Sequence, residues 1–328
     1  MSSPTSSLTS YRPDIASALE EFNLAMDRQG FIGHRILPVI HTRNAGGVFG
    51  KIPIEQLLQT HTTERAPGSG YARGNWQFTN DSFATVEHGW EEPVDENDRN
   101  VYAEWFNDDV DTIAGQRAFD FVLRNAELRA AALLFNATTW TGATLTTAIT
   151  NEWDDATNAT PIVDVTAAKA KVWALTGIWP NAVILNRTVF NNLRVTDEIK
   201  DAIASSGAGD RTLIRDITEA QIAQAFDVDH VLVAGSAKNT AKEGQAVSIS
   251  SIWSNEYVMV ARVGVTNDLK EPCVGRTFHW PGDNSDPLGY VEEYEEPQTR
   301  SQIIRVRHQV QEKVLYTECA HLLSNATT

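Results

Sequence analysis

The segment from Asn44 to residue 104 limits the folds open to this chain more than any other part of the sequence. It contains two glycine-rich stretches, NAGGVFGKIP and RAPGSGYARGN, which bracket short strand-like pieces, and it shows no helical pattern of its own. About sixty residues without a helix are unusual inside a compact domain, because such a segment buries little apolar surface by itself. Two interpretations follow: the segment is disordered, or it is a hairpin that projects from the body and needs a partner surface.

Acidic residues crowd the end of this segment and the region after it. Between Asp81 and Asp111 there are eleven acidic residues and one basic residue, Arg99. The stretch is either a solvated face or a surface that meets arginines of a neighbouring subunit. Candidates for those arginines are Arg65, Arg73, Arg300, Arg305 and Arg307.

The strongest helical pattern runs from about Asn107 to Asn136. Asn107 or Asp108 can cap it, and acidic residues fill its first turn, where the helix dipole favours negative charge. At about 1.5 Å per residue it spans roughly 45 Å, so we expect it to cross the whole molecule. The predicted stripe consists of Val110, Ile113, Ala114, Ala118, Phe121, Asn125, Leu128 and Ala132.

An α/β pattern follows. Helices are predicted at 165–176, 187–194, 197–204 and 217–226, strands at 181–186 and 229–235, and a strand pair at 250–263. Asn186 stands between a strand and a helix, where it can cap the helix. No nucleophile, glycine triplet or acidic partner accompanies it, so the junction is predicted to be architectural.

The tail has the clearest alternation of apolar and polar residues in the chain. Ile304, Val306, His308 and Val310 face one way, and polar residues separate them. This pattern predicts a strand with one buried face. His308 is then expected to be a packed, hydrogen-bonded core residue.

Composition argues against several classes of function. The chain has 27 Lys and Arg against 43 Asp and Glu, a net charge of −16, which disfavours tight phosphate binding by the surface as a whole. The N-terminal residues lack the apolar core and basic cluster of a secretory signal. The longest apolar run, Ala130–Phe135, is far too short to cross a bilayer.

Residue patterns for catalysis or metal binding are also missing. The eight histidines are scattered without ligand spacing, and Cys273 and Cys319 are predicted to be small buried residues in a reducing compartment. The loop SSGAGDRT has no lysine after its glycines and no strand before them, so it is predicted to be a flexible surface loop rather than a phosphate loop. No catalytic, cofactor or metal site is predicted, and the chain is not expected to be an enzyme.

Four pieces in fixed order carry a resemblance to a known family. They are FATVEHGWEEPVDENDRNVY (83–102), RNAELRAAALLFN (124–136), the segment from WDDATNATP to EIKDAI (153–203), and the segment from FHWPGD to LLSNAT (278–327). Together they resemble the major capsid proteins of tailed phages, the family with the Hong Kong 97 fold. Each piece is a loose motif, whereas the ordered set is more specific and covers roughly residues 30–328.

The resemblance implies an α+β fold and a domain map. Expected are an N-terminal arm (1–40), an extended loop that lies across a neighbouring subunit (41–104), a peripheral domain with a long spine helix (105–163), an axial domain (164–275) and return strands of the peripheral domain (276–328). The implied function is a major capsid subunit that forms hexamers and pentamers of an icosahedral shell around double-stranded DNA. The shell would assemble in the bacterial cytoplasm and become the virion capsid.

The resemblance also implies partners and contact residues. The partners are copies of the chain, a portal, a separate scaffolding protein and a decoration protein, with no membrane and no sequence-specific DNA binding. Covalent crosslinking between subunits is not expected, because the only lysine of the extended loop is Lys51, near its base. The candidate contact residues between subunits are Arg65, Pro67, Gly68, Gly70, Arg73, Glu91, Glu92, Asp95, Gly207 and Gly209.

Two alternatives stay open at the level of sequence. An encapsulin-type shell around an enzyme cargo would share the fold. A soluble α/β enzyme built on the block from Val165 to Gly275 would instead be a monomer or a small oligomer with a ligand-sized pocket.

Overall fold

The computed structural model describes most of the chain. The described residues are 10–11, 30–51, 53–61, 63–75, 77, 79–97, 99–100, 110–205, 217–242, 244–283 and 286–327. The predicted caps Asn107 and Asp108, and the contact candidates Gly207 and Gly209, lie outside these residues.

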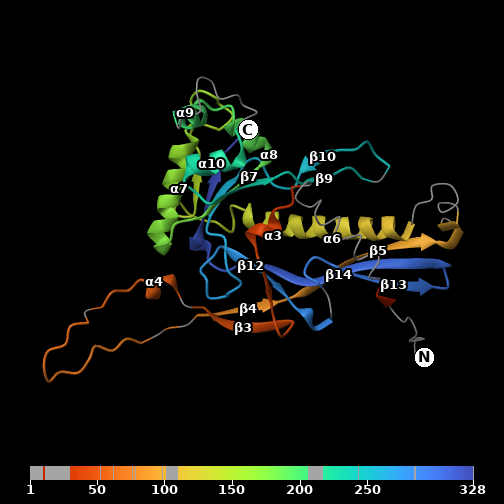
Figure 1. Ribbon diagram of the computed structural model, residues 1–328, viewed down its shortest axis with the longest axis horizontal. Coiled ribbons are helices and arrows are strands. Elements are labelled where there is room, and N and C mark those ends of the chain that lie inside the picture. Colours follow the sequence, from red (N-terminus) through yellow and green to blue (C-terminus); the bar gives the residue numbers. More distant parts are fainter. Residues whose placement is uncertain are drawn as a thin grey trace.

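A five-stranded sheet lies at the centre of the α/β part of the chain (Figure 1). Its strands, in spatial order, are β6 (Thr146–Ala148), β15 (Ala320–Ser324), β11 (Val258–Ala261), β7 (Ala182–Asn186) and β8 (His230–Ala234). The helices of this part are α7 (Pro161–Thr176), α8 (Arg187–Leu193), α9 (Asp197–Ser205) and α10 (Glu219–Phe226). They cover one face of the sheet, and the opposite face packs on other segments. Because both faces are covered, β7 is buried at every position and reads as an uninterrupted apolar run.

The junction after β7 is structural, as predicted. The Asn186 side chain accepts a hydrogen bond from the Thr188 backbone N–H at 2.8 Å, which caps α8. Its amide group also donates to the Ser251 hydroxyl at 2.8 Å and to the Trp253 carbonyl. One side chain thus joins the end of a strand, the start of a helix and a neighbouring loop.

A six-stranded sheet is built around the long strand β14 (Ser301–Val314). The other strands are β13 (Tyr290–Glu296), β12 (Gly275–His279), β5 (Val86–Asp95), β1 (Ser10–Tyr11) and β2 (Val39–His41). β13, β12 and β5 pair with β14 antiparallel, β1 extends the sheet beyond β13, and β2 runs parallel to β12. The predicted alternation in β14 is confirmed, since Ile304, Val306, His308 and Val310 are all buried.

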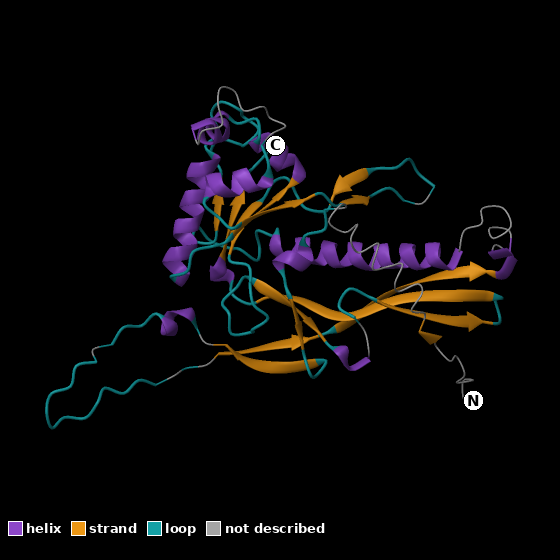
Figure 2. Cartoon of the chain, viewed as in Figure 1, coloured by secondary structure: helices purple, strands orange, loops and turns teal. Residues whose placement is uncertain are grey.

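One helix, α6 (Val110–Leu134), contacts both sheets. Its 25 residues span about 38 Å, and Figure 2 shows it crossing from the α/β part to the far end of β5 and β13. The first half packs through Phe119 and Val122 on β13 and β14. The second half packs through Ala131 and Leu134 on the five-stranded sheet.

A buried carboxylate lies between the two halves of α6. Glu127 accepts hydrogen bonds from the backbone N–H groups of Ile32 at 2.9 Å and Gly33 at 2.8 Å, and from the Trp253 indole at 2.6 Å. Burial raises the pKa of Glu127, and the three hydrogen bonds partly oppose that rise. The carboxylate ties α6 to the short helix α3 (Gly33–Ile36) and to the loop after β10 (Ile249–Ser251).

Two hairpins extend beyond these sheets (Figure 2). The first pairs β3 (Gly46–Lys51) with β4 (Thr79–Ala84), and the chain between them includes the four-residue helix α4 (Ile54–Leu57). The second pairs β9 (Ala237–Asn239) with β10. Short 3-10 helices, η2 (Pro281–Asp283) and η3 (Thr317–Cys319), complete the described elements.

Three local predictions were wrong. The segment 44–104 contains α4 and was expected to have no helix. The predicted strand pair at 250–263 is β10 and β11, which belong to different sheets. The predicted stripe of α6 is correct at Ala114 and Ala118 but wrong at Ile113 and Phe121, which are 43% and 38% exposed, and at Asn125 and Ala132, which are also exposed.

The observed burial along α6 predicts that truncating two neighbouring residues will lower stability by different amounts. Leu123 of α6 is buried, so Leu123→Ala should lower the free energy of unfolding by about 2–5 kcal/mol. Phe121→Ala should lower it by only about 0.5–1.5 kcal/mol, because Phe121 is 38% exposed and, among the described residues, its aromatic contact is with Trp90 at 4.8 Å. Chemical denaturation of both variants measures the difference, and a larger loss for Phe121→Ala would contradict this packing.

The buried His308 is expected to make the stability of the fold sensitive to acid. Burial and then the charge of Arg129 lower the pKa of His308 from 6.5 to about 4. The imidazole contacts the Pro287 carbonyl at 3.1 Å and an Arg129 nitrogen at 3.3 Å. Between pH 6.5 and 4 the unfolded chain takes up a proton that the folded chain does not, so stability falls as the pH drops. His321 adds to the effect, because its pKa is also lowered to about 4.

The measurement is the free energy of unfolding at several pH values through this window. At about 1.4 kcal/mol per pKa unit, His308 accounts for up to roughly 3 kcal/mol of the loss. His308→Gln should flatten the curve by that share, and His61→Gln, at an exposed position, should leave it unchanged. Identical curves for the wild type and His308→Gln would refute the assignment.

Candidate assembly surface

An aromatic cluster fixes the base of the β3–β4 hairpin to the body of the molecule. Phe83 of β4 stacks on Phe278 of β12, with ring centroids 4.8 Å apart and an interplanar angle of 8°. Phe49 of β3 lies 5.7 Å from the same Phe278 ring. Phe278 is fully buried beside Leu315, so the hairpin starts from the edge of a packed core.

Two lysines support the same base. Lys313 of β14 binds the Asp81 carboxylate and the Ser82 carbonyl, and Lys51 of β3 binds the Leu315 carbonyl. Burial raises the pKa of Asp81, but the hydrogen bonds from Lys313 and the Ser82 backbone outweigh it and leave this pKa below its ordinary value. We did not predict these lysine contacts, which join residues more than 200 positions apart in the sequence.

The next contact along the hairpin is made by Leu58, just after α4. Gly177 ends α7 in a left-handed conformation with φ of 68°, and its N–H donates to the Trp173 carbonyl. A Cβ atom at Gly177 would lie 2.9 Å from a Leu58 methyl carbon. Glycine is therefore needed here both for its backbone conformation and for the close approach of the hairpin.

Beyond Leu58 the chain extends away from the body (Figure 1). We call residues 63–75 the tip. Arg65 donates to the Ser69 carbonyl at 2.6 Å and lies 4.7 Å over the Tyr71 ring. Nothing lies within 4 Å of a Cβ atom placed at Gly68, Gly70 or Gly74.

The tip therefore brings together five of the predicted contact residues. They are Arg65, Pro67, Gly68, Gly70 and Arg73, and all five are exposed. Among the described residues neither Arg65 nor Arg73 forms an ion pair, so the tip carries two positive charges that face solvent.

The remaining described candidates lie in the six-stranded sheet. Arg305 of β14 lies between Glu91 at 2.6 Å and Glu292 at 3.5 Å. Arg307 pairs with Glu292 at 2.6 Å and approaches Glu87 at 3.9 Å. These charges line the face of the sheet that points away from α6, because residues 304 and 306 face the helix.

A shallow hollow opens on this charged face. Its volume is about 490 Å³, and Glu87, Gly89, Trp90, Glu91, Arg305 and Arg307 line it. Gly89 lies opposite Arg307 in the strand pairing, and a Cβ atom there would be 3.1 Å from the Arg307 Cβ atom. The missing side chain leaves the hollow open above the arginine.

Glu92 and Asp95 have local partners. Glu92 points to the opposite face from Glu91 and accepts from the Trp90 indole at 2.9 Å. Asp95 accepts from the Asn97 N–H at 2.7 Å. Arg300 pairs with Glu96 at 2.6 Å. Arg300, Arg305 and Arg307, which were possible partners for a neighbour's acidic stretch, thus form ion pairs within their own chain.

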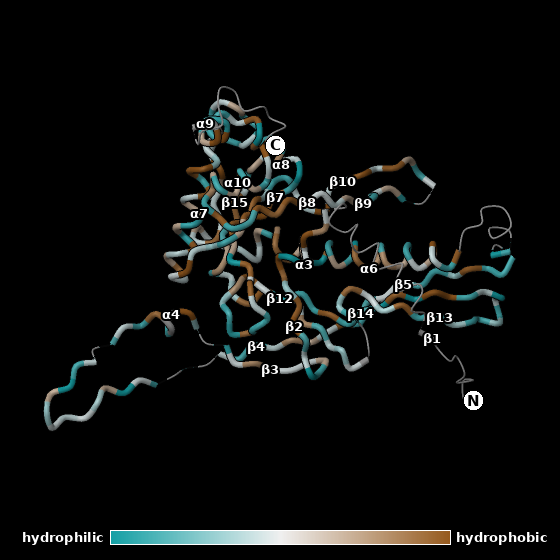
Figure 3. The backbone as a smooth tube through the Cα atoms, in the orientation of Figure 1, coloured by the Kyte–Doolittle hydropathy of each residue, from teal (hydrophilic) through white to brown (hydrophobic). Residues whose placement is uncertain are grey.

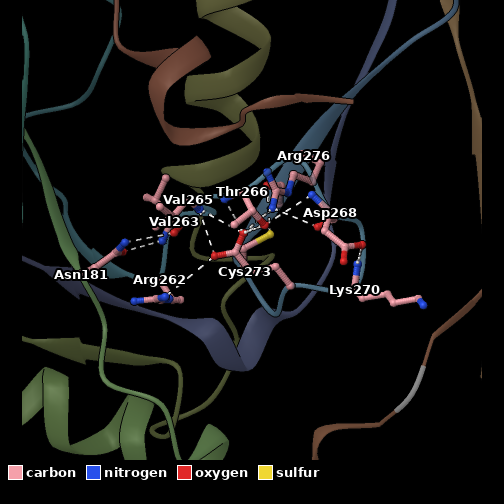
Figure 4. A network of polar contacts seen from close by, with 11 residues as sticks. Asn181, Arg262, Val263, Val265, Thr266, Asp268, Lys270, Cys273 and Arg276 are labelled. Carbon is pink, nitrogen blue, oxygen red and sulfur yellow. Dashed lines mark hydrogen bonds and ion pairs between the residues drawn. The ribbon is translucent and has the colours of Figure 1, made fainter. Parts of the chain in front are cut away.

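A polar network secures the connection between the two sheets, in the loop from β11 to β12 (Figure 4). The Glu271 carboxylate accepts from the backbone of Val265 at 3.0 Å, from the Thr266 hydroxyl at 2.8 Å and from the buried Arg276 at 2.9 Å. Burial raises the pKa of Glu271, and these donors lower it to below the ordinary value. A Cβ atom at Gly264 would lie 2.4 Å from the Arg276 guanidinium carbon, so glycine is required beside this ion pair.

Cys273 is buried beside this network, and burial raises the pKa of its thiol, which disfavours the nucleophilic thiolate. In the described part of the chain no group of three or more His, Cys, Asp or Glu residues could hold a metal ion. No helix in that part has the length and hydropathy to cross a membrane.

Solved structures share this fold, whereas the sequence alone finds no match. No protein-family model matches the sequence, and no curated protein matches it. A phage-related protein from Bordetella bronchiseptica matches the structure with a TM-score of 0.71 at 18% identity, over 97% of this chain and 98% of that chain. The capsid of cyanophage P-SCSP1u matches with a TM-score of 0.57 at 11% identity, over 88% and 86% of the two chains.

This chain has the fold of phage capsid proteins. The α+β capsid fold predicted from the four sequence pieces is confirmed. The fold is shared more widely, since an encapsulin from Synechococcus elongatus matches with a TM-score of 0.53 at 9% identity, over 89% and 85% of the chains.

The aromatic base of the hairpin yields a prediction. Phe83→Ala removes the stack on Phe278, so the free energy of local opening of β3 and β4 should fall by about 1–2 kcal/mol. Amide exchange in both strands should then be roughly tenfold faster, with β7 and β11 unaffected. The matched control is Val48→Ala, since Val48 is 70% exposed on β3. Unchanged exchange in Phe83→Ala would show that another contact holds the hairpin.

Proposed function

We propose that this chain is the major capsid subunit of a tailed phage, which assembles into hexamers and pentamers of an icosahedral shell around double-stranded DNA. The observation that carries the proposal is the exposed tip of the β3–β4 hairpin: its base is anchored by the Phe83–Phe278 stack, and among the described residues nothing lies within 4 Å of its glycines. A long loop without packing is costly in a solitary protein and is useful where a neighbouring copy covers it. The capsid fold supports this interpretation.

The domain map predicted from sequence becomes part of the proposal. Residues 1–40 form an N-terminal arm, 41–104 include the extended loop, 105–163 and 276–328 form the peripheral domain, and 164–275 form the axial domain. Within 41–104 the projecting part lies between β3 and β4, since β5 pairs with β14. Gly207 and Gly209 would then lie in a loop near the capsomer axis.

We also propose the partners and location that follow. The subunit acts without catalysis, and its partners are copies of itself, a portal, a separate scaffolding protein and a decoration protein. It assembles in the bacterial cytoplasm and ends in the virion capsid. The DNA inside is enclosed without sequence-specific binding, in keeping with the net charge of −16.

An encapsulin-type shell is the second candidate, because an encapsulin shares the fold. Electron microscopy and light scattering of the purified protein test both candidates against a stable 36.2 kDa monomer, which would exclude a shell. Nuclease-resistant DNA inside the particles supports the phage capsid, and a protein cargo without DNA supports the encapsulin.

Charge reversal at the tip gives a specific prediction. We expect Arg65→Glu with Arg73→Glu to abolish assembly, because the tip would then repel the acidic residues proposed to meet it on the next subunit, Glu91, Glu92 and Asp95. The melting temperature should stay within about 2 °C, since both side chains are exposed and the effect of such surface changes is within about 0.5 kcal/mol. Sedimentation measures assembly.

The control makes the same change in charge elsewhere. Arg43→Glu with Lys270→Glu also reverses two exposed positive charges, and this variant should assemble. Normal particles from the tip variant would disprove the proposed role of Arg65 and Arg73.

A further inference from the structure

The β9–β10 hairpin leaves apolar side chains uncovered. Its two strands form a sheet of their own, and in the described chain no third strand joins them. Val247, two residues before β10, and Ile249, the first residue of β10, are 72% and 73% exposed. Figure 3 shows the hydrophobic stretch on the β10 side of this projecting hairpin. An isolated two-stranded hairpin is only marginally stable in water, so this one needs a covering surface.

A second uncovered apolar surface runs along α7. Val163, Ala167, Ala170 and Trp173 recur at intervals of three or four residues and are all exposed, which makes one face of the helix apolar. Beyond the end of the helix, Trp179 stacks on Trp173 with ring centroids 5.7 Å apart. The two indoles are 56% and 48% exposed, respectively.

The lysines of α7 do not interrupt this face. Lys169 turns inward and donates to the carbonyls of Phe226 at 2.6 Å and Asp227 at 3.0 Å. Lys171 reaches the Ala143 carbonyl at 3.2 Å. The apolar stripe of α7 is therefore free of charge along its length, which is unusual for an exposed helix.

The two surfaces lie on opposite sides of the same part of the molecule. In Figure 1, α7 forms one edge of the five-stranded-sheet region, and the β9–β10 hairpin points away from the other edge. They cannot cover each other within one chain. A ring of copies related by rotation can bring each hairpin onto the α7 stripe of the next copy, which would cover both surfaces.

Charge around the two surfaces is complementary. The sequence of the hairpin, residues 237–251, contains Lys238, Lys242 and Glu243, which gives it a net charge of +1. The loop that leads into α7 carries Glu152, Asp154 and Asp155. Opposite charges at the rim of an apolar contact favour the correct orientation of two copies.

We propose that Val247 and Ile249 of one subunit pack on the α7 stripe and the Trp173–Trp179 pair of the next subunit within a capsomer. This contact rests on the proposed capsid function and names a surface different from the β3–β4 tip. The occupant of the α7 stripe is a second copy of this chain.

Two variants of the full chain test the contact. Val247→Asp with Ile249→Asp should leave the far-ultraviolet circular dichroism and melting temperature unchanged, because both side chains are exposed. Burial of a Val or Ile side chain is worth roughly a factor of ten or more in association, so capsomer formation should weaken about 100-fold. The control Ile113→Asp, at a residue 43% exposed on α6, should assemble as the wild type does.

The second variant, Ile249→Cys with Ala170→Cys, is treated with a short bis-maleimide. The native thiols of Cys273 and Cys319 are buried, so the reaction is confined to the new cysteines. On a denaturing gel, a ladder of bands up to the size of the capsomer is expected. Either single variant should run as a monomer, because it lacks the second thiol at the contact.

The outcomes separate this contact from the capsid proposal. A ladder together with weakened assembly of the aspartate variant supports the contact. Wild-type shells with normal assembly of the aspartate variant and no ladder overturn the contact alone. A wild-type protein that stays monomeric at all concentrations overturns both the contact and the capsid function.

Discussion

The arrangement of the molecule depends on α6 being shared by two cores. Its first half covers the six-stranded sheet and its second half covers the five-stranded sheet, so the sheets cannot shift independently without losing apolar contact with the helix. Glu127 lies at the changeover, where three N–H groups from two other segments converge on its carboxylate. Together with the Glu271–Arg276 pair at the β11–β12 connection, this fixes how the projecting hairpins are presented.

The elements best predicted from sequence are those whose environment is uniform. β7 is buried on both faces and β14 alternates strictly, so a single periodicity describes each of them. The stripe of α6 was misassigned because no single stripe exists. The helix faces one sheet through Phe119 and Val122 and the other through Ala131 and Leu134, and a single 3.6-residue pattern averages the two directions.

The candidate surface was predictable only in part, for a similar reason. The position of the tip could be predicted from its glycines and arginines, because these residue types favour turns and carry positive charge. The base depends on Phe278 and Lys313, which meet Phe83 and Asp81 across more than 190 residues, and no local pattern reports such a pairing. Acidic residues of the same stretch pair with arginines of β14, because the strand register places Glu91 opposite Arg305. The sequence alone did not predict this register.

The β3–β4 hairpin is attached to the body at its base, and among the described residues its tip is free of contacts with the body. Its base is held by the rings of Phe49, Phe83 and Phe278 and by Lys51 and Lys313. Leu58 contacts the body again at Gly177. A force applied to the tip is therefore transmitted to β12 and β14, the strands at the middle of the six-stranded sheet. Strain applied at the tip is delivered to the rigid interior of the protein instead of being absorbed at its periphery.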